Sequence, residues 1–322
     1  MGRRARFHDY MAPGYYLITA TAIEGDFQLR RLSVMPNISP ERLKSEGMIL
    51  PVLTPLGKKI EAEIRALPLY HPLLAIKRYV IMPDHIHFVL HVKERLTRKL
   101  GSELAGFFGA CTHALRDHAK LPDSDLQLFQ PFHDQIIFNF PQLDRSIKYV
   151  EDNPRRLIYK RKHPDLFKCR LHVIIGNREY GLMGNIFLLR EVYLLPVRIH
   201  RRWSIEEFDS YEDECIKSIE QGAVAISPGI HPREKAIMNI AVQMGGYVIK
   251  LTDRPLTNRT KPTGKLFDLC IEGRLLLIAP WAARDDKPQK SGYKEFHNMN
   301  DMAKEIAEMP AEIRMKILEV IS

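Results

Sequence analysis

The stretch that decides the fold of the first part of the chain is Leu73–Val92, which reads LLAIKRYVIMPDHIHFVLHV. Two apolar runs, rich in β-branched and aromatic residues, are separated by Pro83-Asp84, a pair that favours a turn. We therefore expect two adjacent strands that meet at this turn. Tyr15–Ala22 has the same composition and predicts another strand, followed by a return strand over Phe27–Val34.

Helical segments flank these strands. Apolar residues recur at helical spacing in Thr54–Ala66, Ser102–His118 and Leu143–Tyr159. We expect Ser102 to cap the second of these helices, because serine accepts a hydrogen bond from the first turn. We expect the third helix to be interrupted near Asn153-Pro154, because a residue before proline tends to leave helical geometry.

The character of the sequence changes near residue 201. Before it, residues 171–197 still have strand composition, with Gly176 and Gly184 as turn points. Beyond it, Ser204–Gln221 is an acidic helix that begins with a Ser-x-x-Glu capping box. Strands and helices then alternate, which indicates a small parallel α/β domain: strands over 223–226, 247–251 and 275–279, a helix over 233–244, and a last helix over 302–321 that Pro310 would kink. We expect two domains, residues 1–200 and 201–322.

The composition is that of a globular protein without a membrane span. Hydrophobic residues make up 45% and charged residues 27% of the 322 residues, and no apolar run is long enough to cross a bilayer. The basic N-terminus is not followed by the apolar core of a signal peptide. No Cys-x-x-Cys pair occurs, which favours reduced thiols and a cytoplasmic location over a disulfide framework or a cysteine zinc site.

The net charge of +9 is unevenly spread when the chain is divided at residue 200. Residues 1–200 carry 30 lysines and arginines against 20 acidic residues, and residues 201–322 carry 18 against 19. Arg145–Arg170 alone holds nine basic and three acidic residues. Such a segment is either a solvated helix face or a phosphate-binding surface. The charge is compatible with nucleic acid without requiring it.

The pair His85 and His87 is the sharpest local feature. In a strand, residues i and i+2 project from one face, so the two imidazoles can reach a single ion. Neutral imidazole is a good ligand for divalent metals. The alternative is two histidines that bind no metal, and the spacing alone leaves both open. His91 lies on the same face, and we interpret it as structural.

A second feature is the helix around Tyr149. Tyr149 and Asn153 are separated by four residues, so on a helix the phenol and the amide oxygen face the same small volume. Arg145 and Arg156 fall on the same side, where they could hold phosphates near the phenol. The alternative is a half-buried tyrosine on an amphipathic helix with a solvated basic face.

Together, the two features resemble a known family. MPDHIHFVLHV (82–92), followed by YVEDNPRR (149–156), is similar to the motifs of the REP-associated tyrosine transposases, which belong to the HUH single-strand transposases. LFQPFHD (128–134) resembles the stretch that lies between the two motifs. The resemblance covers residues 10–165. It implies an α+β, ferredoxin-like domain with an antiparallel sheet in which the histidine strand is central.

The resemblance also implies roles for individual residues. His85, His87 and Asn153 would bind Mg²⁺ or Mn²⁺, and Tyr149 would be the nucleophile that forms a 5′-phosphotyrosine with single-stranded, hairpin-forming DNA. The basic residues around the nucleophile are expected to contact the DNA: Arg145, Lys148, Arg155, Arg156, Lys160, Arg161 and Lys162. The sequence departs from the family at Pro131 and Arg156, neither of which is a metal-ligand or nucleophile position.

A weaker resemblance covers residues 223–281. Ala225–Ile230, Gly245–Ile249 and Leu275–Pro280 are similar to segments of the Rossmann-like domain of DNA-processing protein A. A strand that ends in a glycine-bearing loop before a helix is a general phosphate site. Here only Gly229 remains in the loop, so a structural or partner-binding α/β domain is the stronger interpretation.

Three functions remain open at this stage. The first is a single-strand endonuclease and strand transferase, and the second is a domesticated DNA-binding protein or regulator that does not cut. The third is a metal protein that binds no nucleic acid. The joint presence of His85, His87 and Tyr149 favours the first, because a binder needs no nucleophile. The lack of a His-Glu-x-x-His motif or of cysteine ligands weighs against the third. A monomer and a homodimer are both compatible with the sequence.

Overall fold

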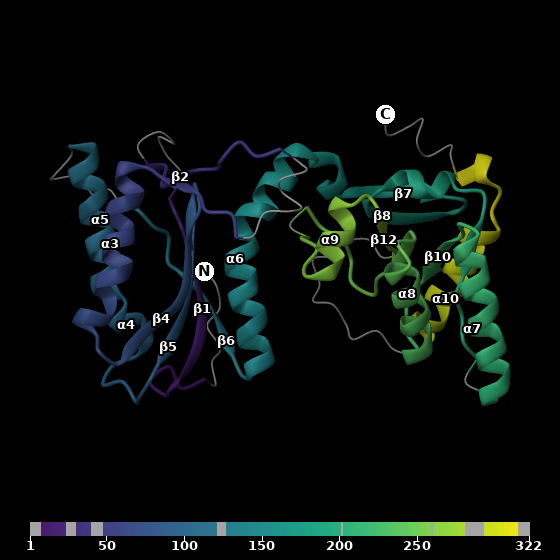
Figure 1. The fold of residues 1–322 in the computed structure, drawn as a ribbon, viewed down its shortest axis with the longest axis horizontal. Coiled ribbons are helices and arrows are strands. Elements are labelled where there is room, and N and C mark those ends of the chain that lie inside the picture. The colour runs from purple at the N-terminus through teal and green to yellow at the C-terminus, as the bar shows by residue number, and fades with distance from the viewer. Residues whose placement is uncertain are drawn as a thin grey trace. The chain divides into compact units, whose positions relative to one another are not determined.

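The computed structural model describes residues 8–23, 30–39, 48–120, 127–200, 202–258, 260–280 and 293–314. The chain forms two compact units that divide between Ile158 and Tyr159, each with a sheet of its own (Figure 1). Residues 159–200, which the sequence assigned to the first domain, therefore lie in the second unit. The reason is strand pairing, because the hairpin formed by residues 170–184 joins the second sheet.

The first unit is built on a four-stranded antiparallel sheet. Its order is β4-β5-β1-β6, so the histidine strand β5 lies inside the sheet. Two helices, α3 and α5, connect β1 to β4 and β5 to β6, which gives the β-α-β-β-α-β order of ferredoxin-like folds. The elements are β1 (Gly14–Thr21), α3 (Pro55–Tyr70), β4 (Leu74–Ile81), β5 (His85–Val92), α5 (Ala105–Ala119) and β6 (His133–Ile137).

The two faces of this sheet are covered by different helices. Ile86, Phe88 and Leu90 of β5 belong to the core beneath α3 and α5. Val89 belongs to a second core cluster with residues of α6 (Phe140–Lys162). Figure 1 shows α3 and α5 on one side of the sheet and α6 on the other. Because side chains alternate along a strand, β5 presents its histidines to α6.

The helix α6 continues through Pro154 rather than breaking at Asn153-Pro154. A proline inside a helix removes one backbone hydrogen bond and crowds the preceding turn. Here Pro154 is buried, and the side-chain amide of Asn153 donates to the carbonyl of Tyr149 at 3.1 Å. Pro154 removes the hydrogen bond to the carbonyl of Val150, and its buried packing offsets this cost, so the expected interruption was wrong.

Two smaller expectations were also wrong. Ser102 is not a helix cap, because it lies inside the short helix α4 (Leu100–Glu103), whose buried Glu103 pairs with His71 and Arg98. Within the described part of 27–34, only β2 (Ser33–Val34) is a strand, and it pairs with β3 (Val52–Leu53) rather than with β1. Residues 27–29 of that segment lie outside the described residues.

The second unit has a six-stranded mixed sheet in the order β7-β8-β12-β11-β10-β9. Strands β9 to β12 are parallel, and β8 and β7 continue the sheet in antiparallel fashion. Gly176 and Gly184 have positive φ angles of 60° and 111°, as suits turn positions. The strands are β7 (Arg170–Ile175), β8 (Arg178–Gly184), β9 (Leu194–Pro196), β10 (Val224–Ser227), β11 (Val248–Leu251) and β12 (Leu275–Ala279).

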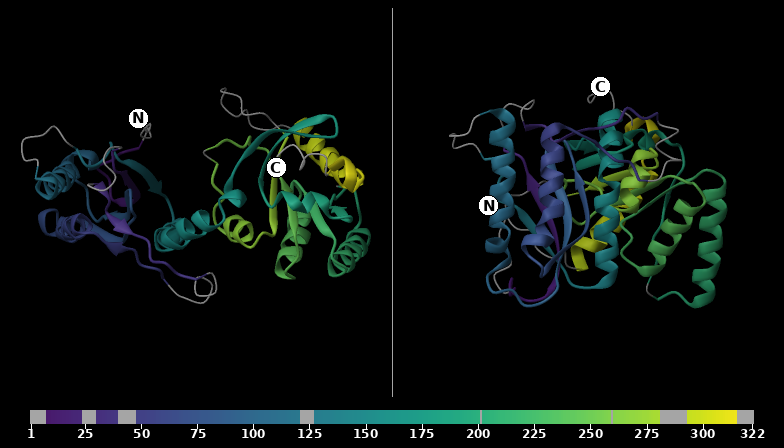
Figure 2. Two further views of the ribbon diagram at one scale, coloured as in Figure 1. Left: turned by 90° about the horizontal axis from the view of Figure 1, so that it is seen from above. Right: turned by 60° about the vertical axis from the view of Figure 1, so that its left-hand side comes forward.

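Helices cover both faces of this second sheet. The core on one face includes residues of α7, α8 and α9, and the core on the other includes α10 (Figure 2, left). Ser204 and Glu207 form the expected capping box. Helix α10 ends at Glu308, and residues 311–314 are helical again after Pro310, so the helix expected over 302–321 is interrupted at the proline. Residues 315–321 lie outside the described residues. The helices are α7 (Ile205–Glu220), α8 (Pro232–Gln243), α9 (Lys265–Ile271) and α10 (Tyr293–Glu308).

The observed division changes the distribution of charge. Residues 1–158 carry 22 basic and 17 acidic residues, and residues 159–322 carry 26 and 22. The net charges of +5 and +4 show that the basic excess is shared, not confined to the unit with the histidine pair. Among the described residues, no helix has the length and apolar character needed to cross a membrane.

Candidate active site

His85 and His87 lie side by side on β5, with ring centroids 4.7 Å apart. His87 is buried, at 6% exposure, although it is a polar residue. Its Nδ1 lies 2.8 Å from the hydroxyl of Thr19, its partner in the register of β1. His85 is more open, and its Nδ1 lies 2.7 Å from the carboxylate of Asp84. Each ring is thus oriented by a hydrogen bond at its own Nδ1.

This arrangement suits metal ligation. Histidines that bind a metal through one ring nitrogen are commonly held by a hydrogen bond at the other. When the Nδ1–H of His85 donates a hydrogen bond to Asp84, the Nε2 of the neutral ring carries the lone pair. No cluster of three histidine, cysteine or acidic side chains with metal-site geometry occurs among the described residues. Within the described part of the chain, an amide oxygen is a candidate for a third protein ligand.

Tyr149 reaches the histidines from α6. The ring centroids of His87 and Tyr149 are 5.4 Å apart, in an edge-to-face arrangement. Tyr149 is half-buried and lies among the apolar residues that pack between α6 and the sheet. The fold thus brings together a phenol and two imidazoles that are separated by more than sixty residues in the sequence. The guanidinium of Arg156 lies 5.7 Å from the centre of the tyrosine ring.

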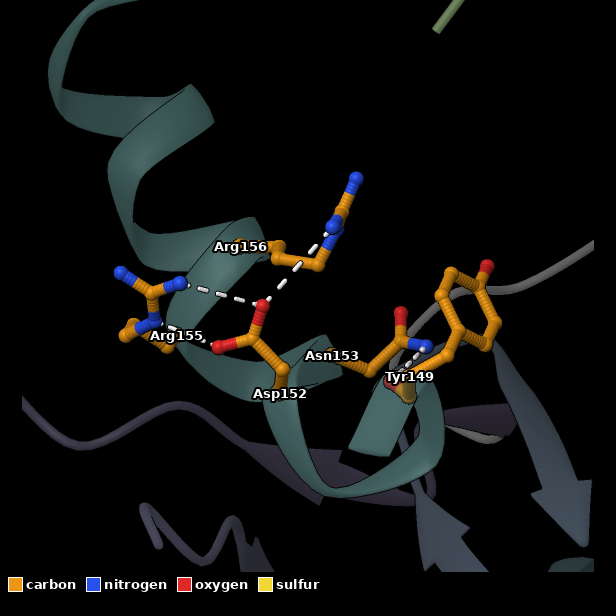
Figure 3. Close-up of polar contacts among 5 residues, drawn as sticks. All are labelled: Tyr149, Asp152, Asn153, Arg155 and Arg156. Atoms are coloured by element: carbon orange, nitrogen blue, oxygen red, sulfur yellow. Dashed lines mark hydrogen bonds and ion pairs between the residues drawn. The ribbon is translucent and has the colours of Figure 1, made fainter. Parts of the chain in front are cut away.

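Asn153 projects from the same side of α6 as Tyr149 (Figure 3). Its amide nitrogen is bound to the carbonyl of Tyr149, which fixes the orientation of the carboxamide. The amide oxygen, the only atom of that group able to bind a cation, is the remaining polar atom. The donor set of two imidazoles and one amide oxygen fits a divalent ion that accepts nitrogen and oxygen ligands.

Two of the arginines expected to bind DNA, Arg155 and Arg156, pair with an acidic side chain of the same helix. Both oxygens of the Asp152 carboxylate accept from the guanidinium of Arg155, and Arg156 lies 3.8 Å from the same carboxylate (Figure 3). Arg145 and Lys148 are exposed near the start of the helix. The three remaining basic residues lie in its last turn, in the second unit: Lys160, Arg161 and Lys162. Among these, the Lys160 ammonium contacts the rings of Phe167 and Phe267.

Sequence reasoning missed Thr19 and Asp152. Thr19 is recognisable only once the register of β1 with β5 is known, because it faces His87 across the strand pair. Asp152 could have been found, since it lies three and four residues before two arginines on a helix.

His91 stacks on Tyr15 with ring centroids 4.2 Å apart. Burial, with Lys77 and Lys93 nearby, lowers the pKa of His91.

Comparison with known proteins gives little further information. No protein-family model matches the sequence, and no curated protein matches it. One similar solved structure is described as a REP-associated tyrosine transposase bound to a REP hairpin, with 15% identity and a TM-score of 0.30. The similarity covers 48% of this chain and 73% of that chain. A TM-score of this size does not establish a common fold, so the residues of the site carry the functional argument.

Proposed function

We propose that the first unit is a metal-dependent single-strand DNA endonuclease and strand transferase with Tyr149 as its nucleophile. The observation that carries the proposal is the contact between Tyr149 and His87, with ring centroids 5.4 Å apart. A hydroxyl nucleophile next to two oriented imidazoles suits metal-assisted phosphoryl transfer. The motif resemblance of residues 82–92 and 149–156 points to the same reaction.

The groups that would hold the metal are His85, His87 and the amide oxygen of Asn153. Asp84 and Thr19 would orient the two imidazoles, and the carbonyl of Tyr149 would orient the amide. Bound there, Mg²⁺ or Mn²⁺ would neutralise charge on the non-bridging oxygens of the scissile phosphate and orient it.

The chemistry of the chain itself centres on the phenol. The Tyr149 oxygen attacks phosphorus, the bond from phosphorus to the 3′ oxygen breaks, and the phenol proton passes to solvent. The departing oxygen takes up a proton and becomes a 3′-hydroxyl, which leaves a 5′-phosphotyrosine. The bond energy is retained, so a 3′-hydroxyl of another strand can reverse the step. The guanidinium of Arg156 near the ring favours the negative charge that develops on the phenol oxygen.

Single-stranded DNA that forms hairpins is the proposed partner. Arg145 and Lys148 are exposed on α6 within one turn of Tyr149 and can contact phosphates on one side of the nucleophile. Such contacts release counterions, so binding should weaken steeply with salt. Arg155 would contact phosphate only by sharing its guanidinium with Asp152.

The test is incubation of the full chain with end-labelled single-stranded hairpin DNA and Mn²⁺, followed by denaturing gels. We expect a covalent protein–DNA adduct that is lost in Tyr149→Phe and in His85→Ala. Matched controls are Tyr70→Phe and His113→Ala, which alter exposed side chains on α3 and α5, on the opposite face of the sheet. Both controls should form the adduct at the wild-type rate.

The same experiment separates the competing functions. Tight DNA binding without cleavage, over a broad library of hairpins, would contradict the nuclease and support the non-cutting regulator. An adduct that persists in Tyr149→Phe would assign the nucleophile to another residue. Absence of both binding and cleavage, with Mn²⁺ still bound, would support a metal protein that does not act on DNA.

A further inference from the structure

A cavity of about 230 Å³ lies in the second unit, whereas the residues assigned to catalysis belong to the first. It lies between α8 and α9, over the sheet strands β10, β11 and β12, and reaches Gly229 in the loop after β10. Figure 1 shows α8 and α9 beside one another. All its lining residues belong to the same compact unit, so the cavity does not depend on how the two units are arranged.

The lining combines an apolar floor with a cationic rim. Lys235, Lys250 and Lys265 come from three different elements, α8, β11 and α9, and all three line the cavity. Among the described residues, no carboxylate lines the cavity and no ion pair neutralises these three ammonium groups. Three lysines on one cavity without a carboxylate make its potential positive, which favours an anionic ligand. The floor consists of Met238, Val242, Val248, Leu266, Leu269 and Leu275.

The backbone amides at the N-terminus of α8, next to the cavity, already have a hydrogen-bond acceptor within the protein. In many α/β proteins, a phosphate binds the free amides at the start of the helix that follows a strand. Here the amides of Ile230 and His231 both donate to one carboxylate oxygen of Glu234, at 2.8 and 3.0 Å. The other oxygen accepts from the amide of Ile199, and Glu234 is 1% exposed. An incoming phosphate must therefore be bound by the lysines rather than by the backbone of α8.

We propose that this cavity binds a nucleoside monophosphate. The apolar floor offers a surface for the base, and the three ammonium groups offer charge-assisted hydrogen bonds to the phosphate. The Asn239 side chain at the rim can both donate to and accept from a base edge. A cavity of about 230 Å³ is smaller than the roughly 300–1,000 Å³ of typical small-molecule pockets. One nucleotide therefore suits it better than a dinucleotide.

The test is isothermal titration of the full chain with the 5′-monophosphates of adenosine, guanosine, cytidine and uridine. We expect at least one of them to bind with a Kd below about 1 mM. The corresponding nucleoside, which lacks the phosphate, should bind about tenfold or more weakly. Lys250→Gln combined with Lys265→Gln should weaken the nucleotide by a similar factor, whereas Lys217→Gln, an exposed change on α7 outside the cavity, should not.

Each outcome of the titration either supports or overturns the nucleotide site, and none of them depends on DNA cleavage. Tyr149→Phe should bind the nucleotide as the wild type does, because Tyr149 lies in the other unit. Failure of all four nucleotides to bind, or equal weakening by Lys217→Gln, would overturn the proposal. A 5′-phosphorylated oligonucleotide that needs Lys250 and Lys265, when no free nucleotide binds, would overturn it in favour of a DNA-end site.

Discussion

Replacing Thr19 with valine removes the hydroxyl that orients His87 while keeping the shape of the side chain. The hydroxyl lies 2.8 Å from Nδ1 of His87, whose ring is only 6% exposed, so water has little access to replace it. Loss of such a partner typically weakens metal affinity or activity about 10- to 100-fold. This corresponds to about 1.4–2.7 kcal/mol. We expect the Mn²⁺ concentration for half-maximal adduct formation to rise about 10- to 100-fold in Thr19→Val.

The assay is a Mn²⁺ titration of adduct formation with labelled hairpin DNA, alongside urea unfolding of each variant. Valine is well suited to strands, so the unfolding midpoint should stay near that of the wild type. Thr21→Val is the matched control, because Thr21 lies on the same face of β1 opposite His85 but its side chain is exposed. An unchanged Mn²⁺ dependence in Thr19→Val would refute the argument that this hydrogen bond orients a metal ligand.

Three further predictions concern stability. Glu234→Ala leaves three backbone amides without their acceptor. In urea unfolding, it should lower the free energy of unfolding of the second unit by about 3 kcal/mol or more. A loss no larger than that of Glu207→Ala, at the exposed cap of α7, would contradict this. Phe88→Ala empties a fully buried site against Phe107 and should cost the first unit about 3–5 kcal/mol, whereas a cost below about 1 kcal/mol would mean that the core is looser than described. Burial raises the pKa of Tyr16 to about 12, so the folded state keeps a proton that the unfolded state releases near pH 10. Stability should therefore fall between about pH 10 and pH 12, with a smaller slope in Tyr16→Phe, and an identical slope in both proteins would count against it.

The local features of the site could be predicted from the sequence. The alternation of β5 places His85 and His87 on one face, and helical spacing places Tyr149 beside Asn153. Their meeting could not be predicted from spacing alone, because it depends on which face of the sheet α6 covers. That choice is made by packing contacts such as those of Val89 with residues of α6.

Other features of the fold depend on contacts with neighbouring groups, and a local sequence pattern does not show these contacts. Pro154 predicts a helix break, but the buried packing of the proline accompanies a continuous helix. The glycine-bearing loop after β10 suggests a backbone phosphate site, but the carboxylate of Glu234 fills that position. At the start of α8, a side chain thus bonds to backbone amides that the pattern would leave unpaired.

The most direct test of the central claim is to locate the DNA linkage by mass spectrometry. The adduct formed with hairpin DNA and Mn²⁺ would be digested with nuclease and trypsin, which cuts after Lys148 and Arg155. The resulting peptide contains Tyr149 as its single tyrosine. We expect a nucleotide remnant on this tyrosine, dependent on His85. A remnant on any other residue, or DNA cleavage without any covalent linkage, would contradict the account.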